Sequence, residues 1–260
     1  MHNVMKLLNR LLIPGFCLAM FSGPVVRAEE INVAVAANFA PVMRELATAF
    51  EKESGDSVII SSGSSGRLYA QIINGAPFHL FFSADQEKPA LLISNDLGVA
   101  GSLFTYALGT LVLWSSDPGM KVDNAEALRD AGNTGNRAVA MANPRLAPYG
   151  LAATQVLENL EKQGIALPMT VMGENISQAY QFVVTGNAPL GFVAFSQVMD
   201  NGQIKQVSGW IIPQEYYDPI RQDALLLNRA SSNPAAWKFL DFIQSETGQF
   251  LIRKYGYSTD

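Results

Sequence analysis

Ser61-Ser62-Gly63-Ser64-Ser65-Gly66 is the stretch that decides the fold of this chain. It follows the apolar segment Val58-Ile59-Ile60, which predicts a buried strand, and precedes Leu68 to Ile73, which predicts a helix. The first N–H groups of a helix have no partner within the helix, and the helix dipole favours negative charge there. A strand, a turn of small residues and a helix start therefore predict a site for an anion.

Strands and helices alternate on both sides of this turn. Upstream, Ile31 to Ala36 predicts a strand, and Ala37-Asn38 begins a helix in which Asn38 is a candidate cap. The apolar residues of that helix recur at helical spacing: Phe39, Val42, Met43, Leu46 and Phe50. Downstream, Leu80 to Ser83 predicts a further strand. This alternation predicts an α/β fold, in which mostly parallel sheets carry helices on both faces.

A second series begins after a long β-rich run from Thr105 to Trp114, which is long enough to leave one domain and enter another. No polar linker separates the two series. The chain therefore predicts two lobes joined by crossing hinge strands. Lobe I comprises residues 29–108 and 214–260, and lobe II comprises residues 109–213.

Residues 1–28 predict a cleaved signal peptide, which would direct the protein to the periplasm. Lys6 and Arg10 precede an apolar run from Leu11 to Val25, and Val26-Arg27-Ala28 has the small-x-small form of a cleavage site. The alternative of a membrane anchor is disfavoured because the run is short and contains Pro and Gly. A lipoprotein is disfavoured because bulky Phe16 precedes Cys17.

The charge of the mature chain excludes a basic nucleic-acid surface. After removal of Lys6, Arg10 and Arg27, 15 basic and 23 acidic residues remain, which gives a net charge of −8. The only cysteine is removed with the signal peptide, so the mature protein has neither a disulfide nor thiol chemistry. His79 is then the only histidine. We expect no nucleic-acid partner.

Beyond the signal peptide the chain resembles the periplasmic molybdate-binding proteins of ABC importers, a family of two-lobed solute receptors. The resemblance covers essentially the whole mature chain in the same order. It is carried by Ala36-Ala37-Asn38-Phe39, Ser61 to Gly66, Asn74-Gly75-Ala76-Pro77, Phe82-Ser83-Ala84-Asp85, Asn143-Pro144, Ala147-Pro148-Tyr149-Gly150 and Ala188 to Val193.

The resemblance implies a two-lobed periplasmic-binding-protein fold and a monomeric receptor that binds molybdate or tungstate as an oxyanion and delivers it to a membrane permease. It implies no cofactor, no catalytic residue and no direct metal ligand. The implied donors lie at or beside predicted helix starts: the N–H groups of Ala37, Asn38, Ser65, Tyr149 and Ile176, with the Ser65 hydroxyl and the Asn38 side chain. In one branch of the family a tyrosine hydroxyl contributes from the position of Ala194, which Ala194 cannot do.

Other interpretations remain open at this stage. Asn38 could serve only as a helix cap, Ser64-Ser65 only as a flexible turn, and Tyr149 only in packing. A receptor of the same fold could take sulfate, phosphate or a small organic anion. A hydrolytic enzyme is a weaker alternative, because the serine turn matches neither Gly-x-x-x-x-Gly-Lys-Ser/Thr nor Gly-x-Ser-x-Gly.

Overall fold

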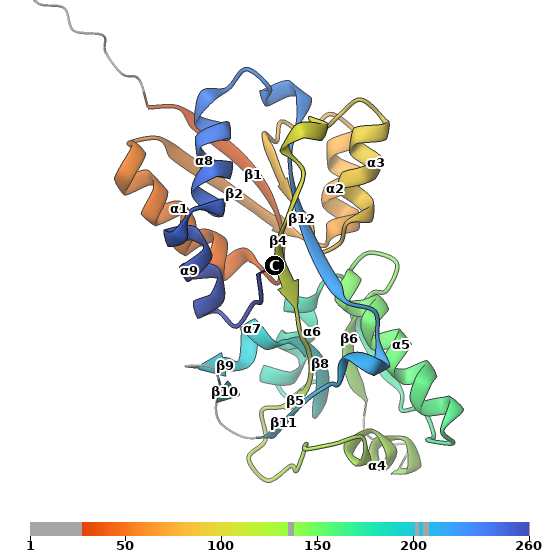
Figure 1. Ribbon diagram of the computed structural model, residues 1–260. Coiled ribbons are helices and arrows are strands. Elements are labelled where there is room, and N and C mark those ends of the chain that lie inside the picture. The colour runs from red at the N-terminus through yellow and green to blue at the C-terminus, as the bar shows by residue number, and fades with distance from the viewer. Residues whose placement is uncertain (1–27, 135–137, 201–202, 205–207, 260) are drawn as a thin grey trace, which may run out of the picture.

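The computed structural model describes residues 28–134, 138–200, 203–204 and 208–259, and Figure 1 shows two lobes stacked one on the other. Apart from Ala28, the predicted signal peptide (residues 1–28) lies outside the described residues. None of the helices in the described part of the chain is long and apolar enough to cross a membrane.

The first lobe contains a sheet of five strands in the order β2-β1-β3-β12-β4. These strands are β1 (Glu30–Ala36), β2 (Ser57–Gly63), β3 (Leu80–Phe82), β4 (Phe104–Gly109) and β12 (Ile220–Leu226). One face carries α1 (Ala40–Ser54), α8 (Pro234–Gln244) and α9 (Glu246–Lys254), and the other carries α2 (Ser65–Ile73) and α3 (Glu87–Ser94) (Figure 1). Short 3-10 turns lie at η1 (Ala100–Ser102) and η3 (Asn228–Ala230).

Side chains of this sheet alternate between two apolar clusters, as the period of a strand requires. Val33 and Val35 of β1 pack in the cluster with α1 and α8, whereas Ala34 packs in the cluster with α2 and α3. Phe82 and Phe81 of β3 divide between the clusters in the same way. Both faces are buried, which explains why these strands appear as continuous apolar runs.

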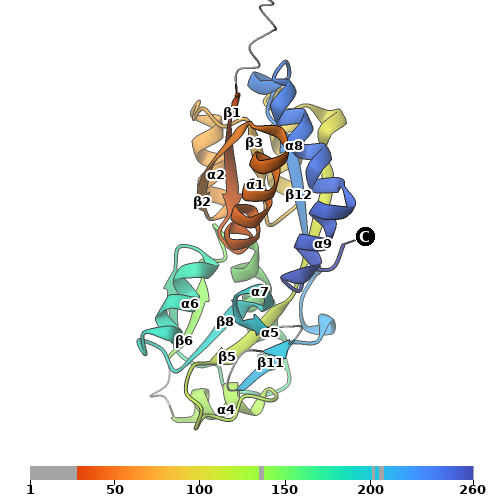
Figure 2. The same cartoon turned by 90° about the vertical axis from the view of Figure 1, so that its left-hand side faces the viewer.

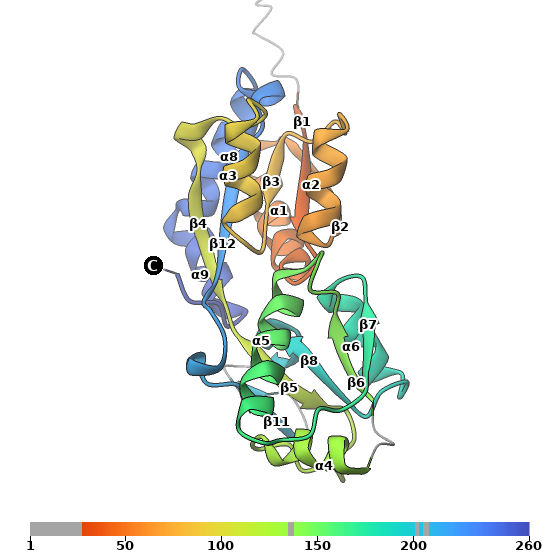
Figure 3. The same cartoon turned by 90° about the vertical axis from the view of Figure 1, so that its right-hand side faces the viewer.

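The second lobe contains another sheet of five strands, in the order β11-β5-β8-β6-β7. They are β5 (Leu111–Ser115), β6 (Val139–Ala142), β7 (Thr170–Gly173), β8 (Leu190–Ala194) and β11 (Ser208–Ile211). Helices α5 (Pro148–Lys162) and α6 (Ile176–Val184) cover opposite faces, as Figures 2 and 3 show. The remaining elements of this lobe are α4 (Glu126–Thr134), α7 (Phe195–Val198), β9 (Met199–Asp200) and β10 (Gln203–Ile204). Between β11 and β12, η2 (Gln214–Tyr216) packs against α5 where the chain returns to the first lobe.

Each five-stranded sheet has one reversed strand. In the first sheet β12 is antiparallel to β3 and β4, and in the second β5 is antiparallel to β8 and β11. The other central pairs, β1 with β2 and β3, and β6 with β7 and β8, are parallel. A strand that enters a lobe from the other lobe starts at the edge where the parallel strands end, so it must run against them. The crossing segments therefore make both sheets mixed.

The predicted two-lobed α/β fold is confirmed, with two corrections. The sheets are mixed because of the crossing strands. In addition, Asn38 does not cap α1: the helix begins at Ala40 with Phe39 as its N-cap residue, and Asn38 has other partners. Helix α4 was not predicted, because its buried apolar face is short and consists of Leu128 and Ala131.

Gly150 allows α5 to approach the end of β6, and this contact generates a prediction. A Cβ atom at Gly150 would lie 2.4 Å from the Ala142 carbonyl oxygen, which is backbone and cannot rotate away. We expect Gly150→Ala to lower the free energy of unfolding by about 1–2 kcal/mol, because overpacking outweighs the better helix propensity of alanine. Denaturant titration measures this loss. Gly101→Ala is the control, since a Cβ atom there meets nothing within 4 Å, and equal midpoints for the two variants would contradict the prediction.

Candidate functional site

The five residues implied as anion donors lie around one small cavity between the two lobes. Its wall consists of Ala36, Ala37, Asn38, Gly63, Ser64, Ser65, Ala84, Ala147, Pro148, Tyr149, Asn175 and Ile176. The space that no atom fills, including its opening to solvent, amounts to only about 200 Å3. It lies beyond the carboxyl ends of β1, β2, β6 and β7, where open α/β sheets bind their ligands. A small ion fits this space better than a larger organic molecule.

The turn between β1 and α1 leaves one N–H group without a partner. Its neighbouring N–H groups are bonded within the protein: Ala37 to the Gly63 oxygen (2.9 Å), Phe39 to the Ala36 oxygen (2.9 Å) and Ala40 to the Ala37 oxygen (3.4 Å). No described residue accepts from the N–H of Asn38. Asn38 is buried at the cavity wall, so this N–H is available to a ligand.

The start of α2 leaves the N–H of Ser65 unused in the same way. Gly66 N–H donates to the Leu146 oxygen of the second lobe (2.9 Å), and Leu68 N–H donates to the Ser64 oxygen (3.0 Å). The Ser65 Oγ accepts a hydrogen bond from Ala84 N–H (2.9 Å). Because its acceptor side is occupied, the hydroxyl proton of Ser65 is free to be donated elsewhere.

In the second lobe, the start of α5 leaves a single N–H group without a partner, because its first residue is a proline. Pro148 has no N–H, while Gly150 and Leu151 both donate to the Ala147 oxygen, at 2.9 Å and 3.1 Å. Within the described chain, the N–H of Tyr149 has no hydrogen-bond acceptor. It is the donor that α5 presents to the cavity.

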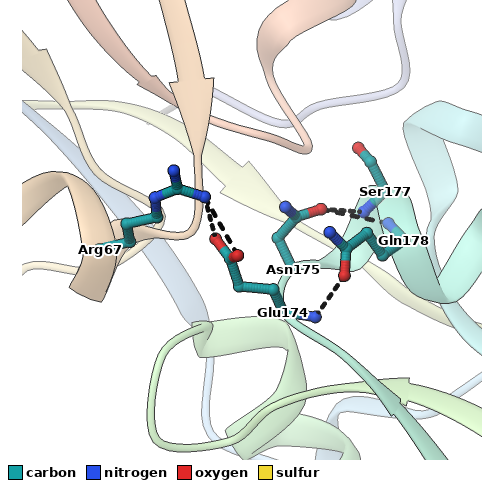
Figure 4. Close-up of polar contacts among 5 residues, drawn as sticks. All are labelled: Arg67, Glu174, Asn175, Ser177 and Gln178. Carbon is teal, nitrogen blue, oxygen red and sulfur yellow. Dashed lines mark hydrogen bonds and ion pairs between the residues drawn. The ribbon is translucent and has the colours of Figure 1, made fainter.

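At the start of α6, a side-chain cap likewise leaves one N–H group unpaired. The Asn175 Oδ1 accepts hydrogen bonds from Ser177 N–H (3.0 Å) and Gln178 N–H (3.1 Å), as Figure 4 shows. No described residue accepts a hydrogen bond from the Ile176 N–H. This cap therefore leaves the Ile176 N–H as the donor of α6, next to the cavity.

Two expectations about individual groups need correction. The Ala37 N–H already donates to the Gly63 oxygen, so it does not act as a free donor, and Ala37 contributes only to the wall. The Asn38 side-chain amide donates both its hydrogens within the protein, to Gln222 Oε1 (2.7 Å) and Tyr257 Oη (3.0 Å). The group that Asn38 can offer a ligand is therefore its backbone N–H.

The lining of the cavity is electrically neutral. None of the described residues that line it carries a charge. Behind Asn38, Tyr257 Oη donates to the Asn38 oxygen (3.0 Å) and lies 2.9 Å from Ser196 Oγ of the second lobe. Burial raises the pKa of Tyr257 to about 12 and also raises the pKa values of Tyr106 and Tyr149. These phenols stay neutral at ordinary pH and do not repel an anion.

Contacts between the lobes surround the cavity. At its rim, Arg67 Nη1 of α2 lies 3.0 Å and 3.1 Å from the carboxylate oxygens of Glu174, just before α6 (Figure 4). Ser177 Oγ of α6 donates to the Ala37 oxygen of the first lobe (3.2 Å). The two lobes are thus held together by hydrogen bonds and one ion pair around the site.

Sequence reasoning missed Ser64 and Asn175 as site residues. Ser64 is 2% exposed, lines the cavity, and its hydroxyl has no hydrogen-bond partner among the described residues. Asn175 directly precedes a helix, which is the usual position of a capping asparagine and the one signal that could have revealed it. For Ser64 the only signal was its place in the serine turn.

Two lobes that meet over a small, uncharged cavity lined by helix starts define a two-lobed receptor for a small solute. The family model described as bacterial extracellular solute-binding protein matches residues 31–258. The chain belongs to this family.

Individual relatives are more specific. The chain is 46% identical to the molybdate-binding protein ModA of Azotobacter vinelandii over 89% of this chain and 90% of that protein. It is 44% identical to the molybdate-binding protein ModA of Rhodobacter capsulatus, over 90% of each chain. The solved periplasmic molybdate-binding protein of A. vinelandii superposes with a TM-score of 0.79 and 38% identity, covering 88% of this chain and 99% of the other.

These findings confirm the family resemblance that the sequence showed. The relatives are named for binding rather than for catalysis, so the hydrolytic alternative has no support. They are also named for a ligand that they bind and not for a cofactor.

The Asn175 cap leads to a prediction. Asn175→Ala removes the acceptor of two N–H groups, so we expect a loss of about 0.5–2 kcal/mol in the free energy of unfolding. Denaturant titration measures it. Asn187→Ala is the control, because its side chain bonds only to exposed Thr185 Oγ1. A stability of Asn175→Ala equal to that of the control would show that the cap does not stabilise α6.

Proposed function

We propose that this protein is a periplasmic receptor that binds the tetrahedral oxyanion molybdate between its lobes. The observation that carries the proposal is that four helix or turn starts each place an unpaired N–H beside one uncharged cavity, at Asn38, Ser65, Tyr149 and Ile176. The names of the close relatives support molybdate as the ion. Tungstate has the same charge and shape, and we propose it as a second ligand.

Neutral donors are sufficient for such an ion. A hydrogen bond to a charged group contributes roughly 1.5–3 kcal/mol, and a helix start adds roughly 0.3–1 kcal/mol through its dipole. Four N–H groups and the Ser65 hydroxyl together can offset the loss of hydration without a countercharge. The cavity favours an ion of one size, and this is how we expect it to discriminate against sulfate.

The proposed mechanism is a clamp. The first lobe (residues 29–108 and 214–260) supplies Asn38 and Ser65, and the second lobe (residues 109–213) supplies Tyr149 and Ile176. An ion that meets one lobe gains its remaining hydrogen bonds only when the other closes on it. That difference in binding free energy drives closure. We further propose that residues 1–28 are a cleaved signal peptide and that the closed monomer delivers the ion to a membrane permease.

Ser65 provides the first test. We expect Ser65→Ala to weaken molybdate binding by about 1–3 kcal/mol, because it removes one hydroxyl donor to a charged ligand. Calorimetric titration of protein that has been stripped of ligand by unfolding and refolding measures the affinity. Ser62→Ala is the control, since Ser62 lies nearby, close to the end of β2, but is exposed and does not line the cavity.

The same titration tests the choice of ligand. Molybdate and tungstate should bind tightly, and sulfate and phosphate should not. If a folded sample binds neither molybdate nor tungstate, the proposal is contradicted. Tight binding of sulfate or phosphate alone would identify a receptor for a different oxyanion.

Closure provides a second test through the Arg67–Glu174 ion pair, which joins the lobes at the rim. The pair is partly exposed, so we expect a coupling free energy for molybdate binding of only about 0.2–1 kcal/mol. A double-mutant cycle with Arg67→Ala and Glu174→Ala measures it, and raising the salt concentration should reduce it. The Lys254–Glu45 pair, which lies within the first lobe, is the matched control and should show no coupling to binding. Additive effects of Arg67→Ala and Glu174→Ala would exclude a role of the rim pair in closure.

A further inference from the structure

Ser64 stands at the N-cap position of α2 but does not behave as a capping residue. Its φ and ψ of −70° and 147° are those of an N-cap, and its carbonyl oxygen accepts from Leu68 N–H at 3.0 Å. Its side chain, however, makes no capping hydrogen bond. A serine at this position normally caps the N–H two or three residues later.

The second lobe occupies one of the two N–H groups that such a cap would satisfy. The N–H of Gly66, which is two residues after Ser64, donates instead to the Leu146 oxygen of the second lobe at 2.9 Å. A Cβ atom at Gly66 would lie 3.1 Å from the same oxygen, so the two lobes are in close contact here. Contact with the second lobe therefore takes one of the N–H groups that the Ser64 hydroxyl would otherwise cap.

The Ser64 hydroxyl is left buried and unpaired at the cavity. The residue is 2% exposed, and its Oγ has no hydrogen-bond partner in the part of the chain that the structure describes. A buried hydroxyl without a partner is unfavourable, and native proteins rarely keep one without a reason. Ser64 lines the cavity together with the free N–H groups, so a bound oxyanion supplies that reason.

We propose that the Ser64 hydroxyl donates a hydrogen bond directly to the bound oxyanion. This assignment rests on the proposed function and adds a second hydroxyl donor beside that of Ser65. The two hydroxyls differ in their hydrogen bonds within the protein: Ser65 Oγ accepts one from Ala84 N–H, whereas Ser64 Oγ has no partner among the described groups. Ser64 can therefore rotate its proton towards whichever ligand oxygen lies nearest.

The assignment predicts opposite effects on the free and the ligand-bound protein. Because the Ser64 hydroxyl makes no bond within the described chain, Ser64→Ala removes an unsatisfied group without removing a cap. The free protein should then unfold at the same temperature as the wild type or at a higher one. A serine with a structural role would instead lower the unfolding temperature of the free protein.

The test combines calorimetric titration with sodium molybdate and thermal unfolding with and without molybdate. We expect Ser64→Ala to raise the Kd roughly ten- to hundredfold and to reduce the molybdate-induced rise in unfolding temperature. Ser62→Ala, at an exposed serine near the end of β2, is the control and should behave like the wild type. Ser64→Gly is the second variant, because glycine is tolerated at an N-cap and it tests the same hydroxyl if Ser64→Ala folds poorly.

The outcomes separate this assignment from the proposed function. If the wild type binds molybdate and Ser64→Ala binds it with the same Kd, only the assignment of Ser64 is overturned. A lower unfolding temperature of free Ser64→Ala with an unchanged Kd would show that the hydroxyl is structural. If the wild type does not bind molybdate, the proposed function fails and the assignment fails with it.

Discussion

The arrangement of this site depends on one constraint: the first N–H groups of a helix have no partner inside the helix. At each helix start around the cavity one unpaired N–H lies beside the cavity, while the N–H groups next to it are absent or bonded by different means. Pro148 has no N–H to satisfy, the Asn175 side chain accepts two, and backbone oxygens accept those around Asn38 and Ser65. A dianion can be held by such donors without a cationic side chain, because the donors are fixed and lie away from bulk water.

The topology follows from the need to bring these helix starts together. Parallel strands place their carboxyl ends, and hence the following helix starts, at one edge of each sheet, and the two edges face each other. The connections between the lobes must then enter each sheet from that edge. This is why β5 and β12 run against their neighbours and why both sheets are mixed. The hinge strands and the site are thus two consequences of the same arrangement.

Contacts across the cavity couple the site to the relative position of the lobes. Tyr257 near the C-terminus bonds to Asn38 in the first lobe and contacts Ser196 in the second, so the chain end returns to the site (Figure 1). Gly66 N–H donates to the Leu146 oxygen and is therefore not available to a cap by Ser64, whose hydroxyl has no partner among the described residues. A contact that joins the lobes thus lies directly beside a free hydroxyl at the cavity.

The sequence by itself determined most of the strands and helices, because their periodicity and their starts are local properties, and the order of its motifs determined the two-lobed class and five of the residues around the cavity through a family resemblance. It missed α4, Ser64 and Asn175. It could not determine which donors stay free, because their partners are distant in sequence. Only the tertiary structure shows that Ala37 N–H is taken by Gly63 and that the Asn38 amide is taken by Gln222, 184 residues away. The Arg67–Glu174 pair, which spans 107 residues, is likewise set by the packing of the lobes. Whether a polar group is hydrogen-bonded within the fold or left free for a ligand depends on which groups pack against it. Only the folded chain brings those groups together.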